Sequence, residues 1–237
     1  MGGWRDMPAE ALEQQYSPSR WSPRLGSDTI IEAHIAATAA GTQRARAGAQ
    51  TSLHVPYGAG EGERLDIYYP TEPSGTFPAL VYIHGGYWQC LRGIYLCGHS
   101  AGAHLAAMVL STDWSQYGVV PDIKGAVLVS GVYDLEPILH TYVNDALDMS
   151  REVAQRNSPV LCVAPAPAGC EVLVAVAQHD SPEFRRQSRE YGQALRAAGW
   201  SVSLLDLAGV DHFDIIEKLS EESYVLTQVI LNMISRA

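Results

Sequence analysis

A serine stands between two glycines in the stretch Gly98-His99-Ser100-Ala101-Gly102, after a β-branched and aromatic run and before a helix-forming run. A turn of this kind between a strand and a helix holds the serine in a strained conformation that exposes its hydroxyl. Such a hydroxyl is suited to attack an acyl carbon. Ala101 would open the following helix, so its backbone N–H can help to stabilise a developing oxyanion.

An acid and a histidine follow this serine in the chain. Asp180 comes directly after the apolar run 171–177, and His212 follows the last predicted strand, 201–207. In the roles of a serine hydrolase, His212 would take the proton of Ser100, and Asp180 would fix the imidazole tautomer and stabilise its charged form. The chain order of serine, acid and histidine is the one expected of an α/β-hydrolase.

Each of these assignments has a rival. Asp180 could instead cap the helix that begins beside it, and Asp134, which follows the preceding strand, is a second candidate for the acid. Asp211 is assigned to shaping the loop of His212. We prefer His212 because it follows the last strand at the expected loop. The competing histidines are His99, His104, His140 and His179.

A second glycine-rich corner, His84-Gly85-Gly86-Tyr87-Trp88, follows the apolar run 79–83 directly. Two successive glycines allow backbone N–H groups to turn toward a point beside the serine. A plain turn is the alternative reading. The presence of Gly-x-Ser-x-Gly downstream favours the functional one.

Strand-like and helix-like runs alternate along the chain. This alternation predicts a mostly parallel sheet with helices on both faces, and active groups gather at the carboxyl ends of such strands. Ser27 is expected to cap the first helix, which would pack through Ile31, Ile35 and Ala39, with Ile30 beside them. The predicted strands are 52–55 and 65–69, as an antiparallel edge hairpin, then 79–83, 93–97, 124–130, 171–177 and 201–207. The predicted helices are 28–46, 101–110, 181–198 and 221–234.

Length and composition favour one large domain. The chain has 237 residues, 47% of them hydrophobic, which is enough for a sizeable core. We expect residues 1–50 to form an arm and cover helix of the same domain as the α/β-hydrolase part, 51–237. The net charge of -10 argues against a nucleic-acid or anionic-membrane partner.

No targeting segment or membrane span is expected. The chain has no basic and apolar leader, and its longest apolar stretch, 160–177, is interrupted by prolines, a glycine and a glutamate. These observations predict a soluble intracellular protein. The four cysteines, Cys90, Cys97, Cys162 and Cys170, have no zinc spacing, so free thiols and no metal are expected.

Four motifs together resemble the kynurenine formamidase (arylformamidase) family of α/β-hydrolases. They are His84-Gly85-Gly86-Tyr87-Trp88, Gly98-His99-Ser100-Ala101-Gly102, Gln178-His179-Asp180-Ser181-Pro182-Glu183-Phe184 and Asp211-His212-Phe213. The resemblance covers nearly the whole chain. It implies hydrolysis of N-formyl-L-kynurenine to L-kynurenine and formate, without a cofactor, in the cytosol and with the nucleus as a second location.

The same resemblance implies roles for individual residues. Ser100, Asp180 and His212 would form the triad. The oxyanion hole would be made by the amides of Gly85, Gly86 and Ala101. Trp88 or Tyr87 would stack on the aryl ring of the substrate, although both rings are equally suited to packing.

One departure from the family pattern is large. In the family a strand and a crossover helix lie between the His-Gly-Gly corner and the strand before the nucleophile, whereas here Tyr87 to Arg92 alone separate Gly86 from Gly93. A segment is therefore missing near Leu91-Arg92. Six residues reach at most about 20 Å, and a five-residue strand is itself about 17 Å long, so the link would only just close.

Without the crossover helix, apolar sheet surface would lie bare, or the two strands would separate. An inactive or poorly folded shortened isoform, with at most an interaction role, is therefore the alternative to the enzyme. A carboxylesterase of broader specificity is a further alternative, because the triad sets the reaction type and the pocket sets the substrate. A homodimer is one way to cover exposed sheet.

Overall fold

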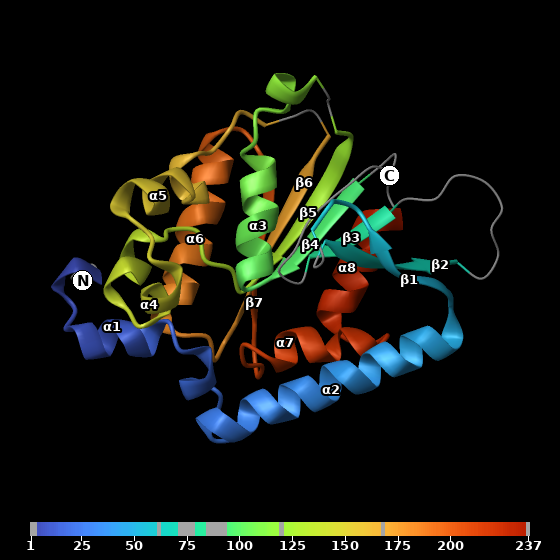
Figure 1. Cartoon of the computed structure of the whole chain (residues 1–237), viewed down its shortest axis with the longest axis horizontal. Helices are drawn as coiled ribbons and strands as arrows, with labels where there is room; N and C mark the ends of the chain where they lie inside the picture. The colour runs from blue at the N-terminus through green and yellow to red at the C-terminus, as the bar shows by residue number, and fades with distance from the viewer. Residues whose placement is uncertain are drawn as a thin grey trace.

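In the computed structural model, which describes residues 4–60, 63–70, 79–83, 94–118, 121–166 and 169–235, five parallel strands form the main sheet in the order β3-β4-β5-β6-β7 (Figure 1). Its strands are β3 (Ala79–Ile83), β4 (Ile94–His99), β5 (Ile123–Val129), β6 (Glu171–Ala177) and β7 (Ser201–Leu207); β1 (Gln50–Pro56) and β2 (Arg64–Tyr69) lie apart. The helices are α1 (Ala9–Gln15), α2 (Ser27–Gly48), α3 (Ala101–Leu110), α4 (Val143–Leu147), α5 (Arg151–Arg156), α6 (Pro182–Ala197), α7 (Asp214–Glu217) and α8 (Val225–Ser235).

Helices cover both faces of this sheet, as predicted. The central strands are near-continuous apolar runs because both of their faces are buried. On one face, Leu96 and Val174 pack with side chains of α3 and α6. On the other, Val127 and Leu173 pack with side chains of α7 and α8, including Ile215. The two hydrophobic clusters fix the sheet between its helical layers (Figure 1).

The first long helix, α2, differs from its prediction in two ways. Its N-cap residue is Gly26, and Ser27 is already the first helical residue and makes no capping hydrogen bond. Ile30 is fully buried, whereas Ile31 and Ile35 are exposed, the latter by 61%. Helical spacing alone does not say which stripe faces the protein, so the predicted packing face was wrong. α2 packs against α7, the helix that follows His212.

The hairpin was predicted correctly as a pair of strands, but its placement at the sheet edge was wrong. β1 and β2 pair antiparallel, with an irregularity between Ser52 and Val55 where His54 has a φ of 55°. Within the described residues they form a two-stranded sheet of their own, and β3 is the edge of the main sheet. The expected segment that is missing from this chain includes a strand, and the main sheet ends at β3 without it.

The strands on either side of the missing segment are paired. β3 and β4 pair in parallel from Ala79 opposite Ile94 to Ile83 opposite Gly98, so the strands do not separate. The link between them, residues 84–93, lies outside the described residues, and the expectation that it only just closes stays a prediction.

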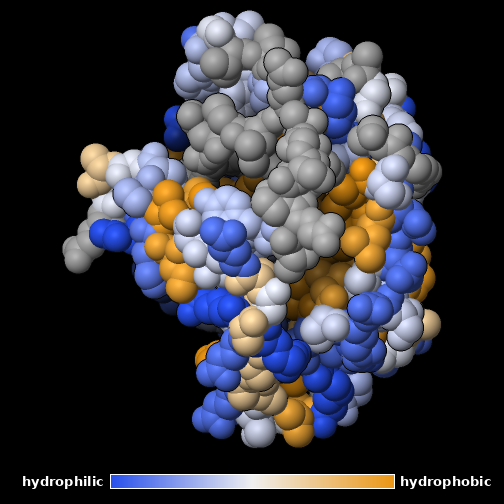
Figure 2. Space-filling model, turned by 90° about the vertical axis from the view of Figure 1, so that its right-hand side faces the viewer, coloured by the Kyte–Doolittle hydropathy of each residue, from blue (hydrophilic) through white to orange (hydrophobic). Residues whose placement is uncertain are grey.

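The cost of the missing segment is seen on one face of β3. Leu80 and Tyr82 point to the same side of the strand and are 47% and 48% exposed. Bare apolar sheet surface was one of the two expected consequences, and it is confirmed. Figure 2, which views this side of the molecule, shows apolar surface on both sides of the grey residues.

The N-terminal segment is fastened to the body of the protein. Trp4, Leu12 and Tyr16 form a third buried cluster with Val132 and Phe184.

Among the helices of the described ranges, none has the length and apolar character that crossing a membrane requires.

Candidate active site

Ser100 lies on the sharp turn between β4 and α3, at the carboxyl end of the sheet. Its φ of 56° and ψ of −120° are strained for a residue with a side chain, as the motif predicts. Gly98 makes the turn possible, because a Cβ there would lie 2.7 Å from the nitrogen of Ala103 and closer still to the carbonyl of Gly102. The Ser100 N–H donates to the carbonyl of Val129 on β5, 2.9 Å away.

Asp180 and His212 are in direct contact. Asp180 lies in the turn between β6 and α6, and His212 lies in the loop between β7 and α7. The Nδ1 atom of His212 is 2.6 Å from Oδ1 of Asp180, and both side chains are buried. The structure thus joins two residues that are 32 positions apart in the sequence.

The second oxygen of Asp180 is also held. Its Oδ2 accepts a hydrogen bond from the hydroxyl of Ser130, at 2.5 Å, and one from the N–H of Ala177, at 2.9 Å. Burial alone would raise the pKa of Asp180. The charge of His212 and the hydrogen bonds from His212, Ser130 and Ala177 outweigh burial and lower the pKa.

An ionised Asp180 sets the state of the histidine. A carboxylate accepts hydrogen bonds only, so Nδ1 of His212 carries a proton and donates it to Asp180. In the neutral ring Nε2 then has the free lone pair, and it can accept a proton from a nucleophile. This geometry orients the imidazole of His212 and leaves its Nε2 atom able to accept a proton.

His99 connects the serine turn to the histidine loop. Its Nε2–H donates a hydrogen bond to the main-chain oxygen of His212, at 2.8 Å, and the two rings lie 4.6 Å apart. Ser100 is the next residue along the chain. The structure gives no hydrogen bond between the Ser100 hydroxyl and the His212 ring, both of which it describes. In unliganded active sites such contacts are often long and tighten when substrate binds.

The rival residues have other partners. Asp134 accepts a hydrogen bond from the N–H of Glu136, and burial raises its pKa. His104 donates to the carbonyl of Asn157, and His140 stacks on Trp4. The carboxylate that reaches His212 is that of Asp180.

The expected oxyanion donors are described in part. Ala101 is the first residue of α3, where a backbone N–H has no acceptor within its own helix. Gly85 and Gly86 lie outside the described residues, as do Tyr87 and Trp88, the expected contacts of the aryl ring.

Sequence reasoning missed several residues of the site. Ser130, which follows β5 and has a φ of 47°, supplies the hydroxyl on Asp180. Phe184 places its ring edge-on to that of His212, 5.2 Å away. The one available signal for Ser130 was its position directly after a buried strand, where parallel sheets gather their active groups.

No metal site accompanies this arrangement in the described part of the chain, where no three His, Cys, Asp or Glu side chains gather as ligands would. The described cysteines, Cys97, Cys162 and Cys170, are free thiols, and two of them are buried.

Comparison with known proteins agrees with the observed fold. The sequence model of the alpha/beta hydrolase fold matches residues 89–215. A protein from Silicibacter sp. TM1040 assigned as a thioesterase has a solved structure that is 22% identical, with a TM-score of 0.73 over 93% of this chain and 98% of its own. Esterase B from Lactobacillus rhamnosis is 14% identical, with a TM-score of 0.61 over 88% of this chain and 94% of its own. At these identities the likeness shows the fold, which is that of an α/β-hydrolase.

Two fish proteins are much more similar in sequence. The chain is 47% identical to the kynurenine formamidase of Danio rerio and 46% identical to that of Salmo salar, with 100% of both chains covered in each case. The first alignment runs over 293 positions and this chain has 237 residues, so at least 56 positions (293 less 237) have no residue of this chain. Because both chains are covered throughout, these positions lie inside the alignment, in agreement with a missing internal segment. The chain therefore belongs to the kynurenine formamidase family of α/β-hydrolases.

Proposed function

We propose that this chain hydrolyses the formamide of N-formyl-L-kynurenine to L-kynurenine and formate. The names of its fish relatives support this substrate. The observation that carries the chemistry is the buried 2.6 Å hydrogen bond between His212 and Asp180, beside the strained turn of Ser100. A base oriented by an acid next to a strained serine is the arrangement that acyl transfer requires.

In the first step, the Ser100 hydroxyl attacks the formyl carbon while Nε2 of His212 takes its proton. The tetrahedral intermediate carries a negative oxygen, which the N–H of Ala101 and the N–H groups of Gly85 and Gly86 stabilise in this proposal. Asp180 stabilises the imidazolium that forms. The C–N bond then breaks, and His212 returns the proton to the aniline nitrogen of the departing kynurenine.

In the second step, water replaces the amine. His212 removes a proton from the water molecule, which attacks the carbonyl of formyl-Ser100, and the serine leaves with that proton. Formic acid leaves and ionises to formate and a proton, and the enzyme returns to its first state. No external oxidant, reductant or cofactor enters this balance.

The substrate suits this machinery for two chemical reasons. A formyl carbon carries one hydrogen and is unhindered, so attack needs little space around Ser100. An arylamine is a better leaving group than an alkylamine because its nitrogen is less basic. Tyr87 and Trp88 are the proposed platform for the aryl ring.

Formate release tests the proposal. The purified chain is first checked for cooperative thermal unfolding, and formate is then measured after addition of N-formyl-L-kynurenine. We expect turnover in the unchanged chain and its loss, by at least about a thousandfold, in Ser100→Ala, which cannot form the acyl-enzyme. A folded chain without turnover would contradict the proposal.

Two alternatives have their own readouts in the same experiment. If the chain is an inactive or poorly folded shortened isoform with at most an interaction role, neither the unchanged chain nor Ser100→Ala would release formate, whether or not thermal unfolding is cooperative. A broader carboxylesterase would hydrolyse a p-nitrophenyl ester with a kcat/KM equal to or above that for N-formyl-L-kynurenine. The relatives' names favour the formamide.

The proposal includes a location in the cytosol, with the nucleus as a second one, and neither nucleic acid nor membrane as a partner. It also includes a homodimer that covers the exposed face of Leu80 and Tyr82 on the edge strand. Sedimentation velocity tests the dimer: Leu80→Lys should convert it to monomer, while Lys124→Leu should not. A monomer at all concentrations would contradict it.

A further inference from the structure

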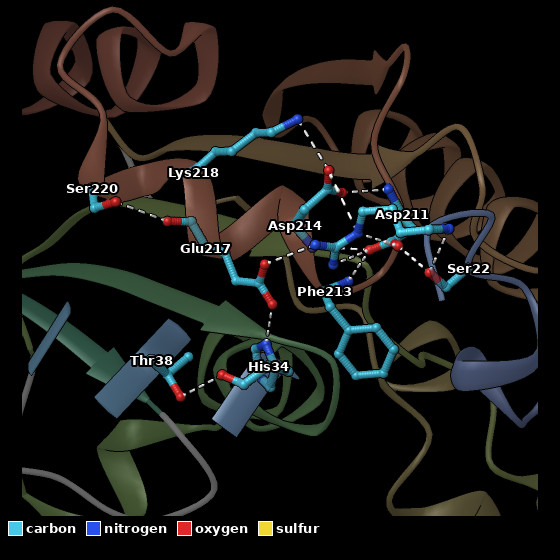
Figure 3. Close-up of polar contacts among 10 residues, drawn as sticks. Ser22, His34, Thr38, Asp211, Phe213, Asp214, Glu217, Lys218 and Ser220 are labelled. Carbon is cyan, nitrogen blue, oxygen red and sulfur yellow. Dashed lines mark hydrogen bonds and ion pairs between the residues drawn. The ribbon is translucent and has the colours of Figure 1, made fainter. Parts of the chain in front are cut away.

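Arg24 connects the N-terminal segment to the loop of the histidine. It lies between α1 and α2, and its guanidinium donates two hydrogen bonds to Asp211, from Nε to Oδ2 at 2.7 Å and from Nη2 to Oδ1 at 3.0 Å. The Ser22 hydroxyl donates to the same Oδ2 (Figure 3). A third guanidinium nitrogen, Nη1, donates to Glu217 on α7 at 3.1 Å. We call Ser22, Arg24 and Asp211 the arm clamp.

Asp211 in turn holds the backbone around His212. Its Oδ1 accepts hydrogen bonds from the N–H groups of Phe213 and Asp214, each at 2.9 Å. The N–H of Asp211 donates to the side chain of Asp214 at 2.5 Å. The carboxylate of the residue before His212 therefore holds the N–H groups of the two residues after it, and Arg24 holds that carboxylate.

The carboxylate depends on these donors because it is buried. The Asp211 side chain is 1% exposed, and the Arg24 side chain that covers it is 33% exposed. Burial alone would raise the pKa of Asp211, but the hydrogen bonds from Arg24 and Ser22 hold it well below its usual range. Without the bidentate cation, a buried charge would remain uncompensated, and the turn that it organises would rearrange.

We propose that Arg24 is a positioning residue, which holds His212 in register with Asp180 and Ser100 by clamping Asp211. The inference rests on the proposed function for its choice of substrate. Arg24 and Asp211 are 187 residues apart in the sequence. In this proposal the N-terminal segment therefore helps to position the active site. Displacing a catalytic group by about 1 Å can cost a hundredfold in rate, and this sets the scale of the effect.

The test compares Arg24→Gln and Arg24→Lys with two controls. Arg46→Gln removes a surface arginine that pairs with Asp66, far from the site. Glu217→Gln removes the charge of another partner of Arg24, outside the arm clamp, and leaves the bonds of Arg24 to Asp211 in place. A general anchoring role for the arm would make Glu217→Gln and Arg24→Gln behave alike.

Activity is measured as kcat and KM for N-formyl-L-kynurenine at 15 °C, well below the melting temperature of each variant. We expect Arg24→Gln to lower kcat by about tenfold to a hundredfold with KM within threefold of the unchanged chain. Arg24→Lys restores part of the loss because its ammonium keeps the charge and can donate to Asp211, although it lacks the bidentate geometry of the guanidinium. Both controls stay within threefold in kcat. An Arg24→Gln protein with an unchanged kcat, or a Glu217→Gln protein with the same loss, would overturn the inference.

A second readout is independent of the substrate. The rate at which a fluorophosphonate probe labels Ser100 reports the nucleophile and its base alone. We expect the labelling rate to fall in Arg24→Gln by the same factor as kcat and to be unchanged in both controls. If the chain labels but does not release formate, the proposed substrate is wrong, and the labelling series still decides the role of Arg24. Equal labelling rates of Ser100 in Arg24→Gln and in the unchanged chain would contradict the positioning role of Arg24.

Discussion

The ring of His99 is bonded through Nε2 to the main-chain oxygen of His212 at 2.8 Å, and the two imidazoles lie 4.6 Å apart. Because His99 immediately precedes Ser100, this bond ties the turn of Ser100, the proposed nucleophile, to the loop of His212, the proposed base. A charged His99 would repel the imidazolium that the proposed mechanism forms on His212. Burial, and next the charge of His212, lower the pKa of His99 to about 3, so it stays neutral.

The neutrality of His99 predicts a pH dependence of stability. Between about pH 3 and pH 6.5 the unfolded chain binds a proton at His99 that the native protein does not bind, so the free energy of unfolding decreases as the pH falls. This residue contributes at most about 1.4 kcal/mol per pH unit. Urea unfolding of His99→Phe at pH 4.5, 5.5 and 6.5 should show a correspondingly smaller slope. Equal slopes would mean that His99 is protonated in the native state.

Replacing each candidate acid with asparagine distinguishes Asp180 from the alternative, Asp134. Asp180→Asn replaces the negative carboxylate beside Nδ1 of His212 with a neutral amide, which permits the wrong imidazole tautomer. We therefore expect kcat to fall by about 10⁴-fold. Asp134→Asn keeps an acceptor for the N–H of Glu136 and should stay within threefold of the unchanged chain. The measurement is formate release by both variants at pH 7.5. A larger loss in Asp134→Asn would transfer the acid role to that residue.

The second oxygen of Asp180 gives a separate prediction at Ser130. Ser130→Ala removes the 2.5 Å donor from a buried carboxylate, which should destabilise the protein by about 1–3 kcal/mol at pH 7. The pKa of Asp180 should rise toward its value in the unfolded chain, so the stability that this carboxylate loses on acidification should be smaller than in the unchanged chain.

Urea unfolding at pH 7 and at about pH 3, below the ordinary pKa of an aspartate, measures both effects. Ser130→Gly is the matched control, because it loses the same donor but relieves the positive φ of 47°, and it should be more stable than Ser130→Ala. If Ser130→Ala unfolds like the unchanged chain at both pH values, the hydrogen bond contributes nothing measurable.

The elements of this fold follow from local sequence more fully than its active site does. Buried parallel strands are continuous apolar runs, and this is why β5 and β6 were predicted within one residue of their bounds. The turn of Ser100 was predictable because Gly98 is part of the sequence motif, and the close backbone contact at this position leaves no room for a side chain.

Tertiary choices were not available from the sequence. Periodicity placed Ile31 and Ile35 on one stripe of α2, but the protein covers the neighbouring stripe of Ile30. The partners of Asp180 and Asp211 were also invisible, because Ser130 lies 50 residues and Arg24 187 residues away along the chain. Long-range hydrogen bonds leave no periodic signal, and a single serine or arginine has many equally plausible roles.

The tightest packing in the site predicts the effect of one added methyl group. Gly98→Ala brings a Cβ against the backbone of Gly102 and Ala103, and backbone cannot move aside as a flexible side chain would. We expect a loss of about 1–3 kcal/mol in the free energy of unfolding, as for other overpacked sites. The turn of Ser100 must open to admit the methyl group, so kcat should fall at least tenfold even where the protein remains folded.

Gly41→Ala is the matched control for Gly98→Ala. Gly41 lies within α2, and a Cβ there would meet Arg44 Nη2 alone, at 3.9 Å. Alanine is favoured over glycine inside a helix, so this variant should gain about 0.5–1 kcal/mol and keep its kcat. Thermal unfolding and formate release are measured for both variants. If the close backbone contact at Gly98 shapes the turn of Ser100, the melting temperature should fall in Gly98→Ala and rise in Gly41→Ala, and kcat should fall in Gly98→Ala alone. A Gly98→Ala protein with the melting temperature and kcat of the unchanged chain would show that the turn accommodates a side chain there.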